Sequence, residues 1–300
     1  MIDIYRETVP ENHLSVLYYI ESRTSLLAAA EGVAIGQTIG NPSVRIEQWE
    51  TQEFLENYCA KIIGSPGELS KETSGFVRIA FPLINFNWPS DGISHLLCVL
   101  LGGQTDIDII SKCQVIDIEN FEQLPSLAPK FGLKGLREFT GQYEKPLLGC
   151  ILKPKIGLNA KDYASIVQEM VDGGADIIKE DEILANPLFC SMEERLSLVR
   201  EIIKDKRIIY LATINGDADS VLEKAKLVSS LGINGVHLNV WGGLGTYSAV
   251  RRLDLPVAIH YQKSGDKAFT HTSNSFRFSW KVLCKLASLS GVDTIHAGMW

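Results

Sequence analysis

From residue 147 onward the sequence alternates short apolar segments with helical patterns, and this rhythm limits the folds available to the chain. Six segments have the length and character of buried strands: 147–155, 175–181, 207–214, 235–240, 256–261 and 293–298. Helical patterns, for example 161–174 and 219–232, separate them. Six strands alternating with five helices predict βα units and a parallel sheet. An open doubly wound sheet is the alternative, although no glycine-rich fingerprint follows the first strand.

Charged residues follow the first, second and fifth strand at their C-terminal ends, where a (β/α)₈ barrel builds its active site. We therefore predict a TIM-barrel domain over residues 147–300. A closed barrel needs eight strands, and the sequence stops at Trp300, just after the sixth. Six strands would leave two apolar edges open. The sequence is therefore expected to be a fragment or truncated form of a longer protein. An open barrel completed by a partner is the alternative.

The first 125 residues mix apolar segments with turn signals, without a strict alternation. The patterns predict strands over 13–22 and 76–86, and helices over 25–38 and 92–103. This mixture predicts a small α+β domain of ferredoxin-like type over residues 1–125. Prolines, glycines and charges follow, and residues 126–146 are predicted to link the two domains.

Composition excludes several classes of partner. A net charge of -7 argues against a surface for nucleic acid or anionic membranes. The chain has no apolar run of membrane-spanning length, and its start lacks the pattern of a signal peptide. Its six cysteines are scattered without a CxxC pair, which is typical of reduced thiols. We therefore expect a cytoplasmic protein without a membrane or nucleic-acid partner.

The segment ADIIKEDE, residues 175–182, changes from apolar strand to charge within four residues. Side chains alternate along a strand, so Lys179 and Asp181 share one face and Glu180 takes the other, toward the helices or solvent. Glu182 joins the first face only if the strand has ended. Two inward carboxylates favour a hard divalent cation, most simply Mg²⁺. The alternative is an ion pair between Lys179 and Asp181 that caps the strand.

Two further groups support a site at this barrel mouth. Lys153 and Lys155 share parity at the end of the first strand, so each lowers the proton affinity of the other. One of them could act as a base, and the pair would attract an anionic substrate; the alternative is two lysines that merely extend into solvent. His260 and His296 lie near the ends of the fifth and sixth strands, which favours a functional role. His237 is read as structural.

With these residues assembled, the chain resembles the large-subunit superfamily of ribulose-bisphosphate carboxylase (RuBisCO). Residues 145–164 resemble the family's first-strand segment with its KPK motif, and 173–182 resemble the segment of its metal-binding lysine. The resemblance implies a Mg²⁺ site formed by Asp181, Glu182 and Lys179, the lysine being carbamylated by CO₂. It also implies that Lys153, Lys155 and His260 act in catalysis, and that His296 contacts the substrate. Glu31 would reach the active site of a neighbouring subunit in a homodimer.

The chain also departs from the family's pattern. True carboxylases have an arginine for a substrate phosphate after the fifth-strand histidine, where this chain has Tyr261, followed by Gln262. A substrate-binding asparagine is replaced by Gly103. The chain therefore resembles most a RuBisCO-like protein. That resemblance implies Mg²⁺-dependent enolase, isomerase or decarboxylase chemistry on a phosphorylated keto compound, for example 2,3-diketo-5-methylthiopentyl-1-phosphate.

Three other functions stay open on the sequence. The chain could be a genuine ribulose-bisphosphate carboxylase despite Tyr261. It could be a metal-free Schiff-base aldolase that uses Lys153 or Lys155, although the acidic residues after Lys179 argue against this. It could also be a truncated, non-catalytic homologue.

Overall fold

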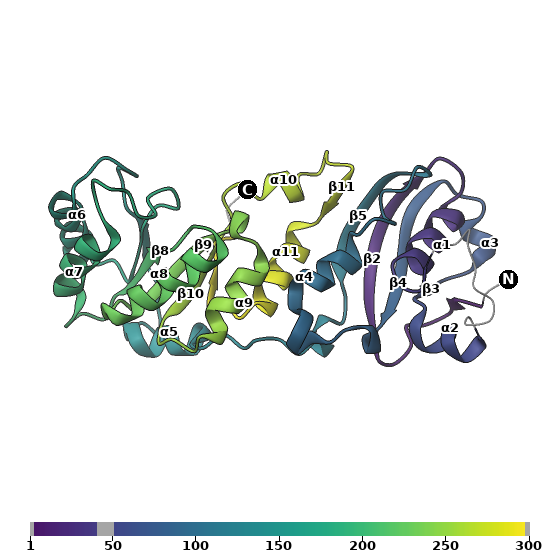
Figure 1. Cartoon of the computed structure of the whole chain (residues 1–300), viewed down its shortest axis with the longest axis horizontal. Helices are drawn as coiled ribbons and strands as arrows, with labels where there is room; N and C mark the ends of the chain where they lie inside the picture. Colours follow the sequence, from purple (N-terminus) through teal and green to yellow (C-terminus); the bar gives the residue numbers. More distant parts are fainter. Residues whose placement is uncertain (1–2, 41–50, 298–300) are drawn as a thin grey trace. The chain divides into compact units, whose positions relative to one another are not determined.

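The structure, a computed structural model, describes residues 3–40 and 51–297 in two compact units (Figure 1). The first unit comprises Met1–Pro125 and Asp266–Leu286, and the second comprises Ser126–Gly265 and Ala287–Trp300. Within the described ranges, no helix has the length and hydropathy needed to span a membrane. The last residue of the predicted strand 293–298 lies outside these ranges.

The first unit is built on a six-stranded mixed sheet in the order β1-β3-β4-β2-β5-β11. Its central strand, β2 (His13–Ser22), pairs antiparallel with both β4 (Ser74–Pro82) and β5 (Ile110–Ile118). Alternate residues of β2 from Leu14 to Ile20 are fully buried, and helix α1 (Leu26–Gly36) packs against this sheet. The remaining elements before residue 125 are β1 (Tyr5–Arg6), α2 (Gln52–Tyr58), β3 (Lys61–Ile63), α3 (Pro66–Leu69), η1 (Leu83–Asn85), α4 (Trp88–Leu100) and η2 (Phe121–Gln123).

A segment from late in the sequence completes this first sheet. Helix α10 (Lys267–Thr270) leads to β11 (Phe276–Phe278), which pairs in parallel with β5 at the edge of the sheet. The register joins Phe276 to Cys113 and Phe278 to Val115. The sequence analysis missed this strand, because three residues are too few to show a strand periodicity.

The second unit contains one parallel sheet in the order β12-β10-β9-β8-β7-β6. The strands are β6 (Gly149–Ile151), β7 (Ile177–Lys179), β8 (Ile209–Thr213), β9 (Gly235–Asn239), β10 (Ala258–Gln262) and β12 (Thr294–Ile295). The connecting helices are α6 (Ala160–Asp172), α7 (Met192–Ile203), α8 (Ala218–Ser230) and α9 (Leu244–Arg252), with η3 (Val240–Gly242) after β9. Helix α11 (Trp280–Leu289) precedes β12, and its residues up to Leu286 belong to the first unit. Every residue of β8 and β9 is buried, as expected for parallel strands covered on both faces. The predicted βα architecture is therefore confirmed.

Part of the predicted linker folds as a helix, α5 (Gly132–Thr140). Its Leu136 forms a buried cluster with Ile209, Leu211 and Ala258, against which Ile177 also packs. These four strand residues belong to β7, β8 and β10, so α5 contributes to the core of the second unit. The predicted linker is thus not only a connection.

Local sequence signals explain where α7 begins and why β8 and β9 can lie close together. Ser191 caps α7 by accepting a hydrogen bond from the backbone N–H of Glu194 at 3.3 Å, which sets Arg195 in the first turns of that helix. Gly235 opens β9 where a Cβ atom would stand 2.9 Å from the carbonyl oxygen of Tyr210. Glycine therefore allows β8 and β9 to approach each other at this point.

Candidate active site and metal centre

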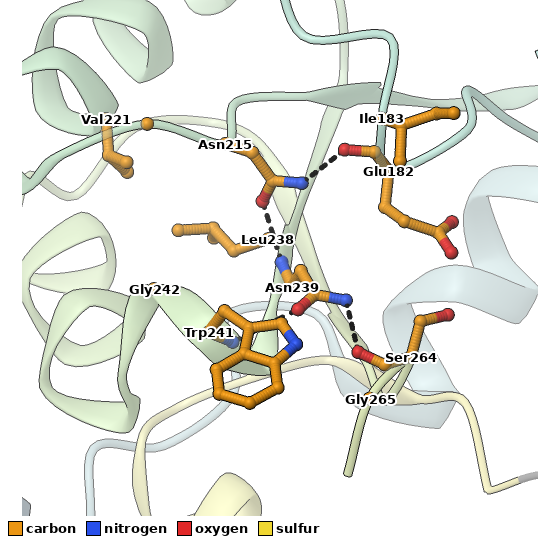
Figure 2. A pocket seen from close by; sticks show the side chains of 11 residues that line it. Glu182, Ile183, Asn215, Val221, Leu238, Asn239, Trp241, Gly242, Ser264 and Gly265 are labelled. Carbon is orange, nitrogen blue, oxygen red and sulfur yellow. Dashed lines mark hydrogen bonds between the residues drawn. The ribbon is translucent and has the colours of Figure 1, made fainter. Parts of the chain in front are cut away.

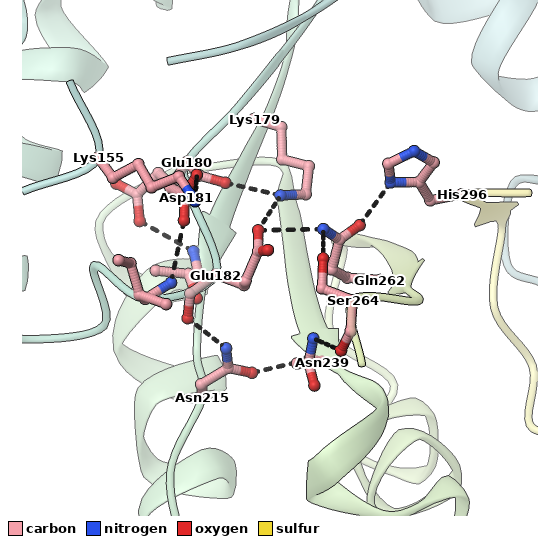
Figure 3. Close-up of polar contacts among 12 residues, drawn as sticks. Lys155, Lys179, Glu180, Asp181, Glu182, Asn215, Asn239, Gln262, Ser264 and His296 are labelled. Carbon is pink, nitrogen blue, oxygen red and sulfur yellow. Dashed lines mark hydrogen bonds and ion pairs between the residues drawn. The ribbon is translucent and has the colours of Figure 1, made fainter. Parts of the chain in front are cut away.

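Lys179 is the last residue of β7, which ends two residues earlier than predicted. Its side chain is buried, and its Nζ donates a hydrogen bond to the carbonyl oxygen of Glu180 at 2.9 Å. The same Nζ lies 3.5 Å from Oε2 of Glu182 (Figure 3). Burial lowers the pKa of Lys179, although the carboxylates of Glu182 and Asp181 oppose the shift. The lowered pKa makes the neutral amine, which is the form that adds CO₂, more accessible than it is in an exposed lysine.

Asp181 is buried and lies close to both lysines of the KPK motif. Its Oδ2 is 2.5 Å from Nζ of Lys153 and 4.0 Å from Nζ of Lys155. Strand β6 ends at Ile151, so strand parity does not place these lysines, yet both ammonium groups approach one carboxylate oxygen. The ion-pair partner of Asp181 is thus Lys153, rather than the Lys179 considered as a strand cap.

Glu182 turns toward Lys179 once the strand has ended. Its Oε2 accepts a hydrogen bond from Nε2 of Gln262 at 3.0 Å, and Oε1 of Gln262 lies 2.7 Å from Nδ1 of His296 (Figure 3). Burial alone would raise the pKa of Glu182, but hydrogen bonding from Ser264 and the charge of Lys179 lower it to about 2. Glu182 is therefore a fixed anion. Gln262, which the sequence analysis noted only as a departure from the family, connects it to His296.

Three histidines lie in a row on the inner face of the sheet. The ring of His260 is 6.4 Å from that of His237 and 6.3 Å from that of His296, centroid to centroid. Nδ1 of His260 is 2.7 Å from the hydroxyl oxygen of Thr294. Burial, followed by the charges of Lys179 and His296, lowers the pKa of His260 to about 3. Burial also lowers the pKa of His237.

Acidification is expected to destabilise this unit. The unfolded His260 binds a proton near its ordinary pKa of about 6.5, whereas the folded ring resists protonation down to a pKa of about 3. Its contribution is therefore present above pH 6.5 and is lost as the pH falls, by about 1.4 kcal/mol per pH unit. Urea unfolding between pH 5 and 6.5 should give a flatter stability profile for His260→Gln than for the unsubstituted protein. Equal slopes would contradict this prediction.

The structure also reveals a pocket that the sequence analysis did not identify (Figure 2). It has a volume of about 430 Å³ and opens beside Glu182 at the ends of β8, β9 and β10. Two asparagines join the segments that line the pocket. Nδ2 of Asn215 donates a hydrogen bond to the carbonyl oxygen of Glu182 at 2.6 Å. Nδ2 of Asn239 donates one to the carbonyl oxygen of Ser264 at 2.8 Å. Both asparagines lie at or just beyond a strand end, so the rule applied to the charged residues could have found them. Trp241, 63% exposed, forms one wall.

Glu31 lies in α1 of the first unit. Its Oε1 accepts a hydrogen bond from the hydroxyl of Tyr5 at 2.5 Å. Its role in a neighbouring subunit's site stays a prediction.

The donor set at the end of β7 fits a magnesium ion if Lys179 contributes an oxygen. Within residues 3–40 and 51–297, no three His, Cys, Asp or Glu side chains form a metal-binding cluster. A magnesium ion bound here would take the carboxylates of Asp181 and Glu182 and a third donor as its protein ligands. A carbamate on the adjacent Lys179 would supply that oxygen, and an all-oxygen set is what Mg²⁺ prefers.

Comparison with known proteins identifies the family of this chain. Residues 132–300 match the family described as ribulose bisphosphate carboxylase large chain, catalytic domain. A ribulose bisphosphate carboxylase of Pyrococcus furiosus is 31% identical over 97% of this chain and 70% of its own length. The chain belongs to the RuBisCO large-chain family.

Relatives within the RuBisCO family have different activities. A 2,3-diketo-5-methylthiopentyl-1-phosphate enolase of Microcystis aeruginosa is 30% identical over 77% of this chain, which spans 60% of the enolase. The crystal structure of an octameric RuBisCO from Pyrococcus horikoshii superposes with a TM-score of 0.86 at 26% identity, over 98% of this chain and 70% of that one. The two-domain fold predicted from the sequence is therefore that of RuBisCO. Identity near 30% to both enzymes leaves the reaction of this RuBisCO family member to be inferred from its site.

Proposed function

We propose that this protein is a Mg²⁺-dependent enzyme of the RuBisCO-like branch, which enolises a phosphorylated keto compound. The observation that carries the proposal is the gathering of Lys179, Asp181 and Glu182 at the end of β7, with Nζ of Lys153 2.5 Å from Asp181. The buried carboxylate of Asp181 and the partly buried carboxylate of Glu182, beside lysines at a barrel mouth, suit the removal of a proton next to a carbonyl group.

Asp181, Glu182 and a carbamate on Lys179 would hold the ion. When bound, Mg²⁺ stabilises the negative charge that develops on a substrate oxygen during enolisation. Gln262 supports the site from one side, because it donates to Glu182 and so keeps that carboxylate turned toward Lys179.

The chain's own cations have distinct roles in this proposal. Lys153, as the neutral amine that is left once its Nζ has given up a proton, would accept the proton from the carbon next to the carbonyl group. Lys155, with its Nζ 4.0 Å from the same Asp181 oxygen, would attract an anionic substrate. His260 would meet the substrate as a neutral ring. His296, fixed by Gln262, would contact the substrate or its phosphate.

The surroundings favour a substrate with one phosphate over a bisphosphate. Tyr261, which replaces the phosphate-binding arginine of carboxylases, is fully buried and packs on Tyr247 at 5.3 Å between ring centroids. The pocket beside Glu182 has no lysine or arginine among its described lining residues, and Trp241, Ile183 and Leu238 give it apolar walls. Such a pocket suits an uncharged end of the substrate. This supports enolase-type chemistry over carboxylation of ribulose bisphosphate.

We further propose a homodimer in which Glu31 of one copy faces the substrate in the other. A structural neighbour from Hyperthermus butylicus is described as a dimeric archaeal RuBisCO, which is consistent with this assembly. The cytoplasmic location stays a prediction from the sequence.

Turnover assays can test the function. The protein is incubated with 2,3-diketo-5-methylthiopentyl-1-phosphate, related keto monophosphates and ribulose bisphosphate, each with Mg²⁺ and bicarbonate or with EDTA. Enolisation of a monophosphate should require Mg²⁺ and increase with bicarbonate. Turnover unaffected by EDTA would exclude the metal mechanism. Trapping of the substrate on a lysine by borohydride would instead support the Schiff-base aldolase.

A further inference from the structure

Glu180, the residue between the proposed metal ligands Lys179 and Asp181, forms a buried ion pair on the opposite face of the sheet. Strand parity predicts that its side chain points to the helices or solvent, and in the structure it meets Arg195 of α7. Nε of Arg195 donates to Oε1 of Glu180 at 2.8 Å, and Nη2 donates to Oε2 at 3.0 Å. Both side chains are fully buried. This bidentate geometry fixes orientation as well as distance.

The Glu180 carboxylate also extends the strand pairing beyond the end of β7. The ladder between β7 and β8 ends with Lys179 opposite Leu211. Beyond it, Oε2 of Glu180 accepts the backbone N–H of Thr213 at 2.9 Å, and Oε1 accepts the hydroxyl of Tyr210 at 2.9 Å. The side chain therefore attaches the peptide between the proposed ligands to β8.

Arg195 binds the chain on the other side of the proposed ligands as well. Its Nη2 donates to the carbonyl oxygen of Ala185 at 2.5 Å, and its Nη1 donates to that of Cys190 at 3.0 Å. Both carbonyls belong to the loop that follows Glu182, in which Ala185 has the unusual φ of 44°. One guanidinium thus holds the chain before and after Asp181 and Glu182.

We propose that Arg195 and Glu180 are positioning residues that set the geometry of the metal site from behind the sheet. Neither residue would touch the ion or the substrate. They would fix the two backbone segments from which the ligands project, as residues next to a metal's own ligands do in general. The inference rests on the proposed function, since it needs the Mg²⁺ site at Lys179, Asp181 and Glu182.

The same unit offers a matched control for the structural effect of a buried ion pair. Arg251 of α9 pairs with Asp293 at 2.5 Å, and both side chains are almost completely buried. Asp293 accepts the backbone N–H groups of Phe131 and Ile259 at 2.8 Å each, so this pair also ties separate segments together. Neither Arg251 nor Asp293 adjoins the proposed ligands in the sequence.

The test measures metal affinity and carbamate formation separately from turnover. Mg²⁺ binding in bicarbonate is followed by calorimetry, and the carbamate is followed by its ¹³C NMR signal, for Arg195→Met, the double variant Glu180→Gln/Arg195→Met, and Arg251→Met. Thermal unfolding of each is recorded in parallel. We expect both Arg195 variants to lose about 10- to 100-fold in Mg²⁺ affinity. The carbamate signal should weaken with the affinity. Arg251→Met should lower the melting temperature and leave the affinity within about twofold of the unsubstituted protein.

Each result supports or overturns the inference. A folded double variant with unchanged Mg²⁺ affinity would overturn the inference, because the ion pair of Glu180 and Arg195 would then contribute to stability only. An equal loss of Mg²⁺ affinity in Arg251→Met would also overturn the inference, since the loss of affinity would then follow from a general destabilisation of the second unit. If Arg195→Met does not fold, the Mg²⁺ affinity of the double variant is the test, because the double variant buries no unpaired charge. An unsubstituted protein that binds no Mg²⁺ would overturn the proposed function itself, and the positioning role with it.

Discussion

Replacing Lys179 with methionine is expected to abolish Mg²⁺-dependent turnover. Methionine has a similar length and suits the buried site, but it has no amine that could form a carbamate. Asp181 and Glu182 would then be left as a pair of carboxylates without the third donor. Loss of the ion would remove the charge stabilisation of the enolate, so kcat should fall on the order of 10³-fold. Turnover and Mg²⁺ calorimetry, with and without bicarbonate, would measure the effect.

Lys204→Met is the matched control for this substitution. Lys204 follows α7 and forms an exposed ion pair with Glu201, 2.6 Å apart, so its replacement should leave turnover and metal affinity unchanged. Circular dichroism and the melting temperature would show whether Lys179→Met keeps the fold. A folded Lys179→Met protein that retains full Mg²⁺-dependent activity would rule out the lysine as a ligand.

Replacing Arg195 with methionine is expected to cause a large loss of stability. The substitution leaves the Glu180 carboxylate fully buried without its counter-ion, and removal of one partner of such a pair costs about 3–5 kcal/mol. The carbonyl oxygens of Ala185 and Cys190 would lose their donor as well. The free energy of unfolding, from urea titration at pH 7, should fall accordingly.

A double variant separates the charge from the packing. Glu180→Gln in the Arg195→Met background removes the unpaired charge and keeps a side-chain oxygen for Thr213 or Tyr210. The double variant should therefore be more stable than Arg195→Met alone. A single variant that loses less than about 1 kcal/mol would show that the pair contributes no more than an exposed salt bridge does.

Local patterns predicted most of the longer elements and the face of the strand that Glu180 occupies. The strand predicted over 13–22 is β2 with the same bounds, because its alternate residues face a buried core. Strand parity also placed Glu180 on the face opposite Lys179, toward the helices or solvent, and the structure shows it on the helix side, where Arg195 binds it. Both features depend on residues close together in the sequence, which is what periodicity describes.

Features that depend on distant partners were not predicted. The pairing of Glu182 with Gln262 joins residues 80 positions apart, and no local pattern encodes such a contact. The approach of Lys153 to Asp181 likewise follows from the neighbouring positions of β6 and β7, and not from parity, since both residues lie beyond their strands. The order of strands in a sheet determines such contacts, and it is a property of the whole unit.

The pairing of β11 with β5 has a consequence for the order in which the protein folds. Without residues 276–278, β5 is an open edge of the first sheet. A ribosome makes the chain from the N-terminus, so this edge stays unpaired until the sequence through β10 has been made. The first sheet therefore gains β11 only after β6, β7, β8, β9 and β10 of the second unit have been synthesised. During this interval, β5 is a place where a nascent chain would need protection from aggregation.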